Sequence, residues 1–422
     1  MNISFSLGKK TVLLIATLCL FSAVFAGAAA FLAGDQRVVY GVRAENCDLN
    51  GMSKAEARQF FEKAGQLKLD HQVIQLTDGI RSWQIRPEEI RLSVNAEKAA
   101  EAAYDVGRSG RNPLENLLAR IQCAKYGREI DMDAGYDEAL LLAKLEAIAA
   151  EIHTDPVNAY CSLNSDGTVR QIAGIVGRKM DAKELCDKLA GPLKKLKLPK
   201  LEIHPEDQQP FVRTEDIMGV DSVLASYTTY FSPGDRGDNI ALAAGCLDGV
   251  LVKSGQIFSF NDTVGSRTYN AGYKNAGVII EGRLEEDVGG GVCQVSSTLY
   301  NAVLLAGLEP TVRAAHFSPS SYCPPGRDAT VADGLLDFKF QNQLPHNVYL
   351  ISRAYGSELT IYILGTWSDL EGNTITLETE GSRMQPSVYR VYRRGGEVVE
   401  REYLHTDSYS EPITAERADT PL

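Results

Sequence analysis

The sequence predicts an α+β protein with an apolar N-terminal segment, two small α+β modules, a compact α+β domain and a β-rich tail. Three observations lead to this fold class. Apolar residues recur at spacings of three and four in several segments, which is typical of helices. Short runs of alternating apolar and polar residues are bounded by glycine-containing turns, which is typical of antiparallel strands. The length of 422 residues exceeds one ordinary core, so two to four domains are expected.

Changes in composition and the positions of turns divide the chain into six expected parts. These are a membrane anchor or signal segment over 1–34, α+β module 1 over 35–120, α+β module 2 over 125–210, a compact domain over 211–365, a β-rich extension over 366–412 and a disordered tail over 413–422.

The first part contains an apolar run over 11–33, which follows Lys9 and Lys10 and has no charge before Asp35. A run of this length can span a bilayer as a transmembrane helix, and its positively charged flank stays on the cytoplasmic side. We therefore expect a single-pass protein of the cell membrane with the bulk of the chain outside the cytoplasm. The alternative is a signal segment that is cleaved at the small-residue site over 24–26.

In each module, helices are expected to combine with a turn between strands. Ser53 is expected to cap the first helix, and Glu56 completes a capping box. The expected elements are helices over 54–64, 95–104 and 137–152 and from 181, and strands over 72–76, 83–85 and 159–163. The modules contain no cluster of catalytic residue types, so we expect them to bind or to space rather than to catalyse.

In the compact domain, a helix that carries a cysteine is expected to pack on an antiparallel sheet. The expected elements are a helix over 239–250, a helix after the glycines at 289–291, strands over 256–260, 275–281, 336–340, 347–352 and 359–364, and a tail hairpin over 387–393 and 398–403.

Composition excludes several classes of function. A net charge of −12 argues against a nucleic-acid partner, and the short basic run over 194–200 is typical of a solvated helix end. The eight cysteines are irregularly spaced and do not predict a disulfide framework. No zinc-ligand spacing occurs, and the six histidines are scattered, so we expect no metal and no cofactor.

The most informative stretch is 289–300, where three glycines precede Cys293 and a helical pattern follows. Glycines permit unusual backbone conformations and close approach of another segment. A cysteine just after such a loop lies at a helix N-terminus, where free N–H groups and the helix dipole favour the thiolate. The alternative is a buried cysteine that packs as a small hydrophobic residue.

Two further residues raise the possibility of thiol chemistry. His316 follows Cys293 by 23 residues, and Asp328 follows His316 by 12. A thiol nucleophile needs an imidazole base, and the base needs a carboxylate that fixes its tautomer. We expect His316 on a short strand, with its ring nitrogen roughly 3–5 Å from the sulfur of Cys293. The alternatives are a partly buried structural histidine and an aspartate that caps a turn.

Several long motifs resemble the VanW family, which takes its name from an accessory protein of vancomycin-resistance clusters. The matching segments are Tyr227–Tyr230, Arg236–Ile240, Gly255–Asn261, Gly289–Ser296, Leu299–Ala302 and Asp328–Thr330. Residues 35–210 are similar to the peptidoglycan-binding domain that commonly precedes VanW domains, with 107–110 as the clearest piece. The tail over 389–412 resembles the C-terminal extension of the same proteins. The resemblance implies peptidoglycan or its stem peptides as partner and a link to glycopeptide resistance.

A second, more distant resemblance is to transglutaminase-like thiol enzymes, which would assign Cys293, His316 and Asp328 to catalysis. The chain departs from that pattern: the gap between Cys293 and His316 is short, and Asp328-Ala329-Thr330 stands where Asp-Pro-Thr is common. Asp337 is an alternative orienting residue for His316. The side chain of Gln294 or a backbone N–H near Cys293 is a candidate for stabilising an oxyanion. The candidate binding residues around the same cleft are Gly289, Gly290, Gly291, Gln294, Arg267, Tyr300 and Tyr322.

Two functions therefore stay open. The first is a membrane-anchored protein outside the cytoplasm that binds the cell wall, in which Cys293 only packs. The second is a Cys-His-Asp enzyme that cleaves or transfers amide bonds of peptidoglycan peptides, as an amidase or a peptidyl transferase. The reactivity of the Cys293 thiol distinguishes them, because a thiolate with a low pKa is alkylated near pH 6 and a packing thiol is not.

Overall fold

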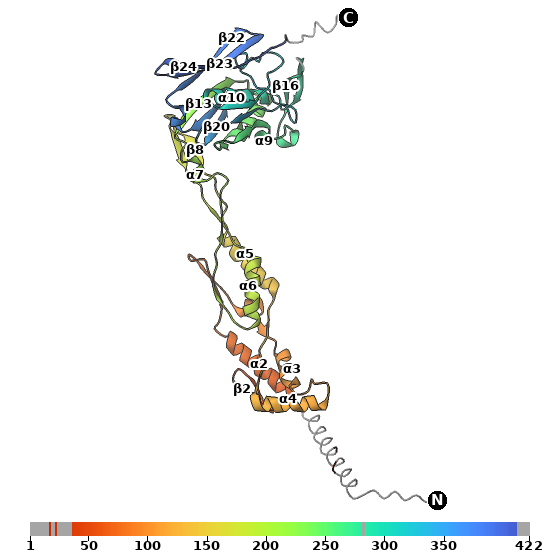
Figure 1. Ribbon diagram of the computed structural model, residues 1–422. Helices are drawn as coiled ribbons and strands as arrows, with labels where there is room; N and C mark the ends of the chain where they lie inside the picture. Colours follow the sequence, from red (N-terminus) through yellow and green to blue (C-terminus); the bar gives the residue numbers. More distant parts are fainter. Residues whose placement is uncertain (1–16, 18–21, 23–35, 281–282, 412–422) are drawn as a thin grey trace, which may run out of the picture. The chain divides into compact units, whose positions relative to one another are not determined.

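A computed structural model describes residues 36–280 and 283–411, together with residues 17 and 22 (Figure 1). Apart from residues 17 and 22, the expected membrane segment over 1–34 lies outside the described residues, as does the expected disordered tail over 413–422. Within the described part of the chain, no helix has the length and apolar character needed to cross a membrane. The described residues form two compact units. One contains the described residues up to Thr154 together with Arg178–Asp207, and the other contains Asp155–Gly177 and the described residues from Gln208 onward.

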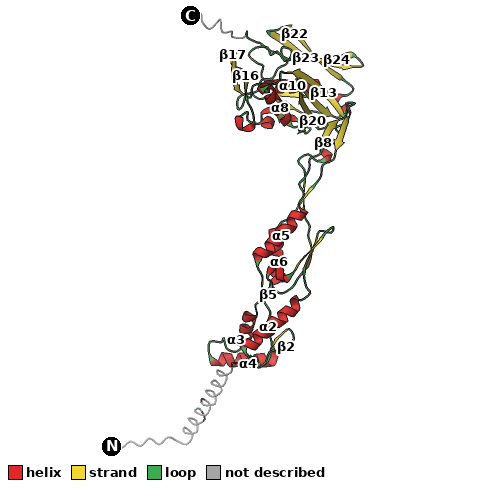
Figure 2. Cartoon of the chain, turned by 180° about the vertical axis from the view of Figure 1, so that it is seen from behind, coloured by secondary structure: helices red, strands yellow, loops and turns green. Residues whose placement is uncertain are grey.

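The first unit is a mixture of helices and short strands (Figure 2). Its helices are α2 (Lys54–Leu69), α3 (Ala96–Asp105), α4 (Pro113–Tyr126), α5 (Glu138–Ile152), α6 (Ala182–Lys194) and the 3₁₀ turn η1 (Pro87–Ile90). Its strands are β1 (Val42–Ala44), β2 (Cys47–Asp48), β3 (Ile74–Thr77), β4 (Ser82–Ile85), β5 (Ser93–Val94), β6 (Arg128–Glu129), β7 (Ala134–Gly135) and β11 (Lys200–Glu202). The strands β10 (Gly177–Lys179) and β12 (Glu206–Gln208) pair where the chain passes between the units.

Helix α2 begins as the sequence predicts. The Ser53 hydroxyl accepts from the Glu56 N–H, and the Glu56 carboxylate accepts from the Ser53 N–H, so the expected capping box is confirmed. Similar side-chain caps from Asn95, Asp137 and Asp181 open α3, α5 and α6. Helix α4, which no periodicity predicted, opens with a proline behind the cap of Asn112.

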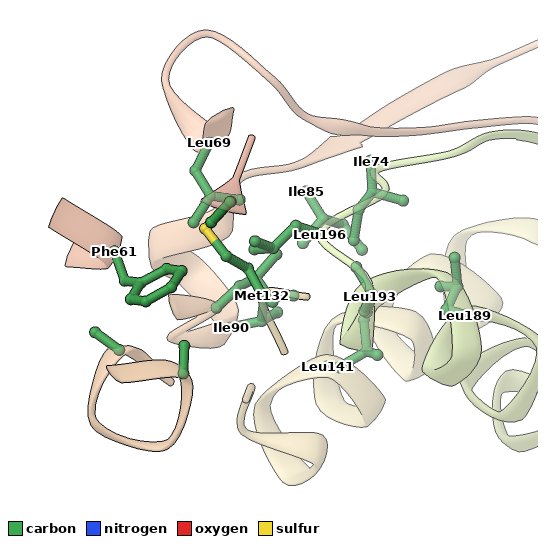
Figure 3. Packing of buried hydrophobic residues seen from close by; sticks show 14 of the residues in the cluster. Phe61, Leu69, Ile74, Ile85, Ile90, Met132, Leu141, Leu189, Leu193 and Leu196 are labelled. Carbon is green, nitrogen blue, oxygen red and sulfur yellow. The ribbon is translucent and has the colours of Figure 1, made fainter. Parts of the chain in front are cut away.

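One apolar cluster holds the first unit together. Helix α2 packs on α3, α5 packs on α6, and the sheet β11-β3-β4 contributes buried residues to the same cluster. Figure 3 shows Phe61, Ile90, Leu141 and Leu193 within this cluster, which draws residues from both predicted modules. The predicted boundary between the modules stays a prediction.

The second unit is built on the antiparallel sheet β13-β21-β20-β14. These strands are β13 (Ser222–Tyr230), β21 (Glu358–Gly365), β20 (Val348–Tyr355) and β14 (Leu251–Val252). Because side chains alternate between the faces of a strand, β20 buries Val348 and Leu350 on one face and Tyr349 and Ile351 on the other.

Each face of this sheet has its own cover. Helices α8 (Asp235–Leu247) and α10 (Val292–Leu305) pack on one face and contact each other (Figure 2). The hairpin of β8 (Tyr160–Leu163) and β9 (Val169–Ile172) and the short helix α7 (Thr214–Ile217) share a smaller apolar cluster on the other face. The hairpin therefore packs in the second unit, although it lies within the range predicted for module 2.

Smaller elements complete the second unit. They are β15 (Ile257–Ser259), α9 (Phe260–Val264), η2 (Tyr269–Ala271), β16 (Asn275–Ile280), β17 (Arg283–Val288), β18 (Glu309–Val312), β19 (Lys339–Gln341), η3 (Trp367–Leu370), β22 (Thr374–Ser382), β23 (Gln385–Arg394) and β24 (Glu397–Thr406). The last three form an antiparallel sheet, so the expected β-rich tail is confirmed. The expected strand placement of His316 is wrong: β18 ends at Val312, and the chain is irregular from there to His316.

Candidate active site

The glycine loop positions Cys293 in the first turn of α10. Gly291 is the N-cap, and its φ of +107° lies in the left-handed region that favours glycine. A Cβ atom on Gly291 would lie 3.0 Å from the side chain of Arg236, and one on Gly290 would lie 2.5 Å from the carbonyl oxygen of Ala276. The glycines thus allow the close approach of α8 and β16 to the start of the cysteine helix.

Cys293 and His316 lie against each other. Burial alone would raise the pKa of the Cys293 thiol, but the hydrogen bond and the positive charge of His316, aided by Arg267, hold that pKa below its usual value. Burial alone would lower the pKa of His316, but its hydrogen bonds with Asp328 and Cys293 raise that pKa to about 9. The two shifts describe one pair, in which the proton moves from sulfur to imidazole.

Asp328 fixes the orientation of His316. Its Oδ2 lies 2.6 Å from the ring Nδ1 and accepts a second hydrogen bond, also of 2.6 Å, from the backbone N–H of His316. The other ring nitrogen is left to face the thiol. Asp328 is only 1% exposed, so water does not compete for these contacts. Burial opposes ionisation of this carboxyl, yet His316, Arg313 and Tyr409 keep the pKa of Asp328 below its usual value.

The β-rich tail supplies the outer support of the site. Tyr409 donates from its hydroxyl to Asp328 Oδ1, and Arg313 donates to the same oxygen over 3.2 Å. Asp407 accepts a 2.5 Å hydrogen bond from Arg313, and burial notwithstanding, His405 and Arg313 lower the pKa of Asp407 to about 2. The orienting carboxylate is therefore held by residues that lie about 80 positions further along the chain.

Cys293 and His316 open into a cavity of about 1170 Å³. Its walls come from the glycine loop, from the segment over 318–322 and from residues 330–336. The backbone N–H of Cys293 has no hydrogen-bond acceptor in the described part of the chain. A carbonyl carbon attacked by the thiolate would bring its oxygen beside this free donor.

The structure separates the other predicted residues into two groups. Tyr322 and Arg267 line the cavity with the glycine loop, and the Tyr322 ring meets the His316 ring edge-on at 6.4 Å. Arg267 is bound to Asp333 and, over 2.7 Å, to Asn261.

The remaining candidates are engaged in structural contacts. Gln294 borders the cavity, but its amide nitrogen donates to Thr229 and to the Tyr230 carbonyl, which ties α10 to β13. Tyr300 is buried in the core beneath Arg313 rather than in the cavity wall. Asp337 binds Ser259 and the Asn261 N–H at the start of α9, and Asp328 is the carboxylate at His316. Among the described residues, no cluster of metal-ligand type occurs.

Sequence reasoning missed Arg236, Arg313, Asp407 and Tyr409. Arg236 is the first residue of a segment that resembles the VanW family, and Arg313 precedes His316 by three residues, but neither position alone indicates a role in the site. No spacing rule connects Asp407 and Tyr409 to a histidine in another element.

Two family matches cover much of the chain. Residues 235–364 match the family described as "VanW like protein", and residues 83–200 match the family described as "Putative peptidoglycan binding domain". Cys293, His316 and Asp328 fall within the first match, whereas Asp407 and Tyr409 lie beyond it.

Two curated proteins are similar to this chain. The "Uncharacterized protein YoaR" of Bacillus subtilis (strain 168) is 38% identical over 226 residues, which are 51% of this chain and 71% of that protein. The "Vancomycin B-type resistance protein VanW" of Enterococcus faecalis (strain ATCC 700802 / V583) is 35% identical over 109 residues, which are 25% of this chain and 40% of that protein. No solved structure matches the chain significantly, so the resemblance to transglutaminase-like enzymes stays a prediction.

Proposed function

The chain belongs to the VanW family, and from this premise we propose that it is a wall-binding thiol enzyme that acts on amide bonds of peptidoglycan peptides. One observation carries the enzymatic part: Cys293, His316 and Asp328 form a continuous relay whose reactive end opens into a cavity. A cysteine that only packs needs neither a base with a raised pKa nor a buried carboxylate behind that base.

The relay supports acyl transfer in two steps. In the first, the Cys293 sulfur forms a bond to the amide carbonyl carbon, the C–N bond breaks, and His316 gives its proton to the departing amine. In the second, water or an acceptor amine attacks the thioester, the C–S bond breaks, and His316 takes the proton of the attacking group. Asp328 keeps the ring of His316 oriented through both steps, and the free Cys293 N–H faces the developing oxyanion.

The first unit is proposed to hold the protein on its substrate. It includes most of the segment that matches the peptidoglycan-binding family, and it lacks a relay comparable to the one around Cys293 within its described residues. The relative from E. faecalis is named a resistance protein, which supports a role in a wall altered under glycopeptide stress.

Attachment to the membrane through the apolar run over 11–33 belongs to the same proposal. Protease added to intact protoplasts would digest the protein if the chain beyond that run faces outward.

Trapping of the thioester tests the enzymatic proposal. Purified protein is incubated with defined stem peptides, and acid-quenched samples are analysed by mass spectrometry for an acyl adduct on Cys293. We expect the adduct with the unaltered protein and with the control Cys246→Ala, whose thiol lies on α8 outside the cavity wall, and no adduct with Cys293→Ala. Added amine acceptors distinguish transfer from hydrolysis. Wall binding without any adduct or turnover would leave a binding protein.

A further inference from the structure

Arg236 has an unusual position in the cavity wall. It lies in the first turn of α8, and its Cγ packs against Gly291, the N-cap of the cysteine helix. Its charge is near enough to Cys293 and Tyr322 to interact with both electrostatically. Yet its guanidinium forms no hydrogen bond and no ion pair with any residue that the structure describes.

The two neighbouring arginines both have hydrogen-bond acceptors. Arg267, on another wall of the same cavity, is bound to Asp333 and Asn261. Arg313, behind the site, has Asp407, Asp328 and two backbone carbonyls as acceptors. Arg236 is thus the one cavity-lining guanidinium, among the described residues, whose donors are unused.

A partly buried guanidinium without hydrogen-bond acceptors costs free energy unless a ligand supplies the acceptors. Arg236 is partly buried, and burial lowers its pKa, which means that the charged form is poorly solvated. Its planar fork of N–H donors matches a carboxylate, with two parallel hydrogen bonds. A single guanidinium suits a monoanion, whereas a dianion would also meet Asp287 and Asp333 on the same cavity.

We propose that Arg236 binds a free carboxylate of the substrate peptide beside the bond that Cys293 attacks. This inference rests on the proposed function for its peptide substrate, and it names the class: peptides with an unblocked carboxylate next to the scissile amide. The carboxylate has two sources, the C-terminus of the departing residue and an acidic side chain. Arg236 is then a specificity-determining residue, because an amidated peptide leaves its donors unpaired.

A first experiment needs no peptide turnover. Iodoacetate and iodoacetamide alkylate the same thiol but differ in a carboxylate, so their rate ratio at Cys293 reports anion recognition. We expect Arg236→Gln to lower the iodoacetate to iodoacetamide ratio by about tenfold or more, since a charge-assisted bidentate contact is lost. Gln keeps the Cγ that packs on Gly291. The matched control Arg394→Gln removes an exposed charge on β23 away from the cavity and should leave the ratio unchanged. An equal ratio in Arg236→Gln and Arg394→Gln would overturn the inference.

A second experiment identifies the source of the carboxylate. Stem peptides are compared in four forms: unblocked, amidated at the C-terminus, amidated at the acidic side chain, and amidated at both. We expect kcat/KM to fall about tenfold to a hundredfold for one single amidation, and Arg236→Gln to abolish that discrimination. Equal rates for all forms would refute carboxylate recognition. If no form reacts while the alkylation ratio still depends on Arg236, the proposed enzyme activity fails and the anion site stands.

Discussion

The chemistry of Cys293 depends on which groups surround its sulfur. Burial favours the neutral thiol, and His316 and Arg267 reverse that preference by their positive charge. Without His316, burial would therefore raise the pKa of the Cys293 thiol, because the largest effect that lowers this pKa is lost. At the residue scale, the neighbours of the Cys293 thiol, and not its exposure, favour the thiolate.

We predict that His316→Ala slows alkylation of Cys293 by iodoacetamide near pH 6–7 by about tenfold or more, since a pKa difference of one unit changes the thiolate fraction tenfold. The midpoint of the rate against pH should move upward. The control His346→Ala removes an exposed imidazole that pairs with Asp369 outside the cavity, and its profile should match that of the unaltered protein. Identical profiles for the two variants would contradict the ion pair.

The pH dependence of turnover has a definite sign. The thiolate forms as pH rises through the lowered pKa of Cys293, and the imidazolium is lost as pH rises through the raised pKa of His316, about 9. Activity should therefore rise on the acid side, stay high across neutral pH, and decline near pH 9. A profile of kcat/KM for a stem peptide checks this. A decline centred near pH 6.5, the ordinary pKa of histidine, would contradict the raised pKa of His316.

Gly291 offers a test of the loop. Gly291→Ala imposes a left-handed backbone on alanine and brings its Cβ to 3.0 Å from Arg236, so we predict destabilisation by about 1–3 kcal/mol and slower alkylation of Cys293. Gly255→Ala is the matched control, because Gly255 also has a positive φ but no atom within 4 Å of the added Cβ. Thermal unfolding should show a loss in both variants, and only Gly291→Ala should change the alkylation rate. Equal alkylation rates would show that the glycine serves the backbone alone.

Sequence reasoning reached part of this site. Cys293, His316 and Asp328 stand in chain order close to one another, and the glycines before Cys293 make a helix start predictable. Arg236 and Tyr409 reach the site only through the packing of α8 and of the tail against α10. Such contacts follow from tertiary structure, and no local periodicity encodes them.

At the scale of elements, helices with a side-chain cap and strands with alternating apolar residues were predictable. The helix that begins after Ser53 has the expected cap, and the helices expected near Asn95, Asp137 and Asp181 begin with side-chain caps from these residues. Helix α8 starts at Asp235, earlier than the apolar periodicity indicated. This start was not predicted because the N-cap is Gly234, which has no capping side chain. The strand expected to hold His316 ends early, since its ring and backbone are fixed by Asp328 instead of by a sheet ladder.

The β-rich tail is predicted to support catalysis, because Tyr409, just after β24, binds the carboxylate that orients His316. Tyr409→Phe removes the hydroxyl that binds Asp328, and we predict a loss of about 1–3 kcal/mol in stability with a fall in kcat of about tenfold. Tyr403→Phe is the matched control, because the Tyr403 hydroxyl donates to the exposed Thr406 at the end of β24 and not to Asp328. Turnover of a stem peptide measures kcat, and denaturant titration measures the stability. A Tyr409→Phe variant with unchanged kcat and an unchanged pH profile would reduce the tail to a structural cover.

At the scale of the whole molecule, the chain leaves its first unit at Thr154 and returns at Arg178. The intervening hairpin buries Ala159 and Cys161 in the second unit, beside Tyr349. Thr154 and Arg178 exchange backbone hydrogen bonds of 3.0 and 2.9 Å, so the exit and the return of the chain are adjacent. A short turn can therefore replace residues 155–177 without stretching the first unit.

We predict that residues 36–154 joined by a short Gly-Ser turn to 178–207 fold cooperatively and co-sediment with purified cell wall at physiological salt. The contiguous segment 36–210 is the control: it keeps the hairpin but removes its partner sheet, so its apolar face should bind a hydrophobic dye and promote aggregation. Circular dichroism during thermal unfolding measures folding, and sedimentation with wall sacculi measures binding. A folded unit that stays in the supernatant would make the first unit a spacer, and the second unit would then have to find its peptide substrate unaided.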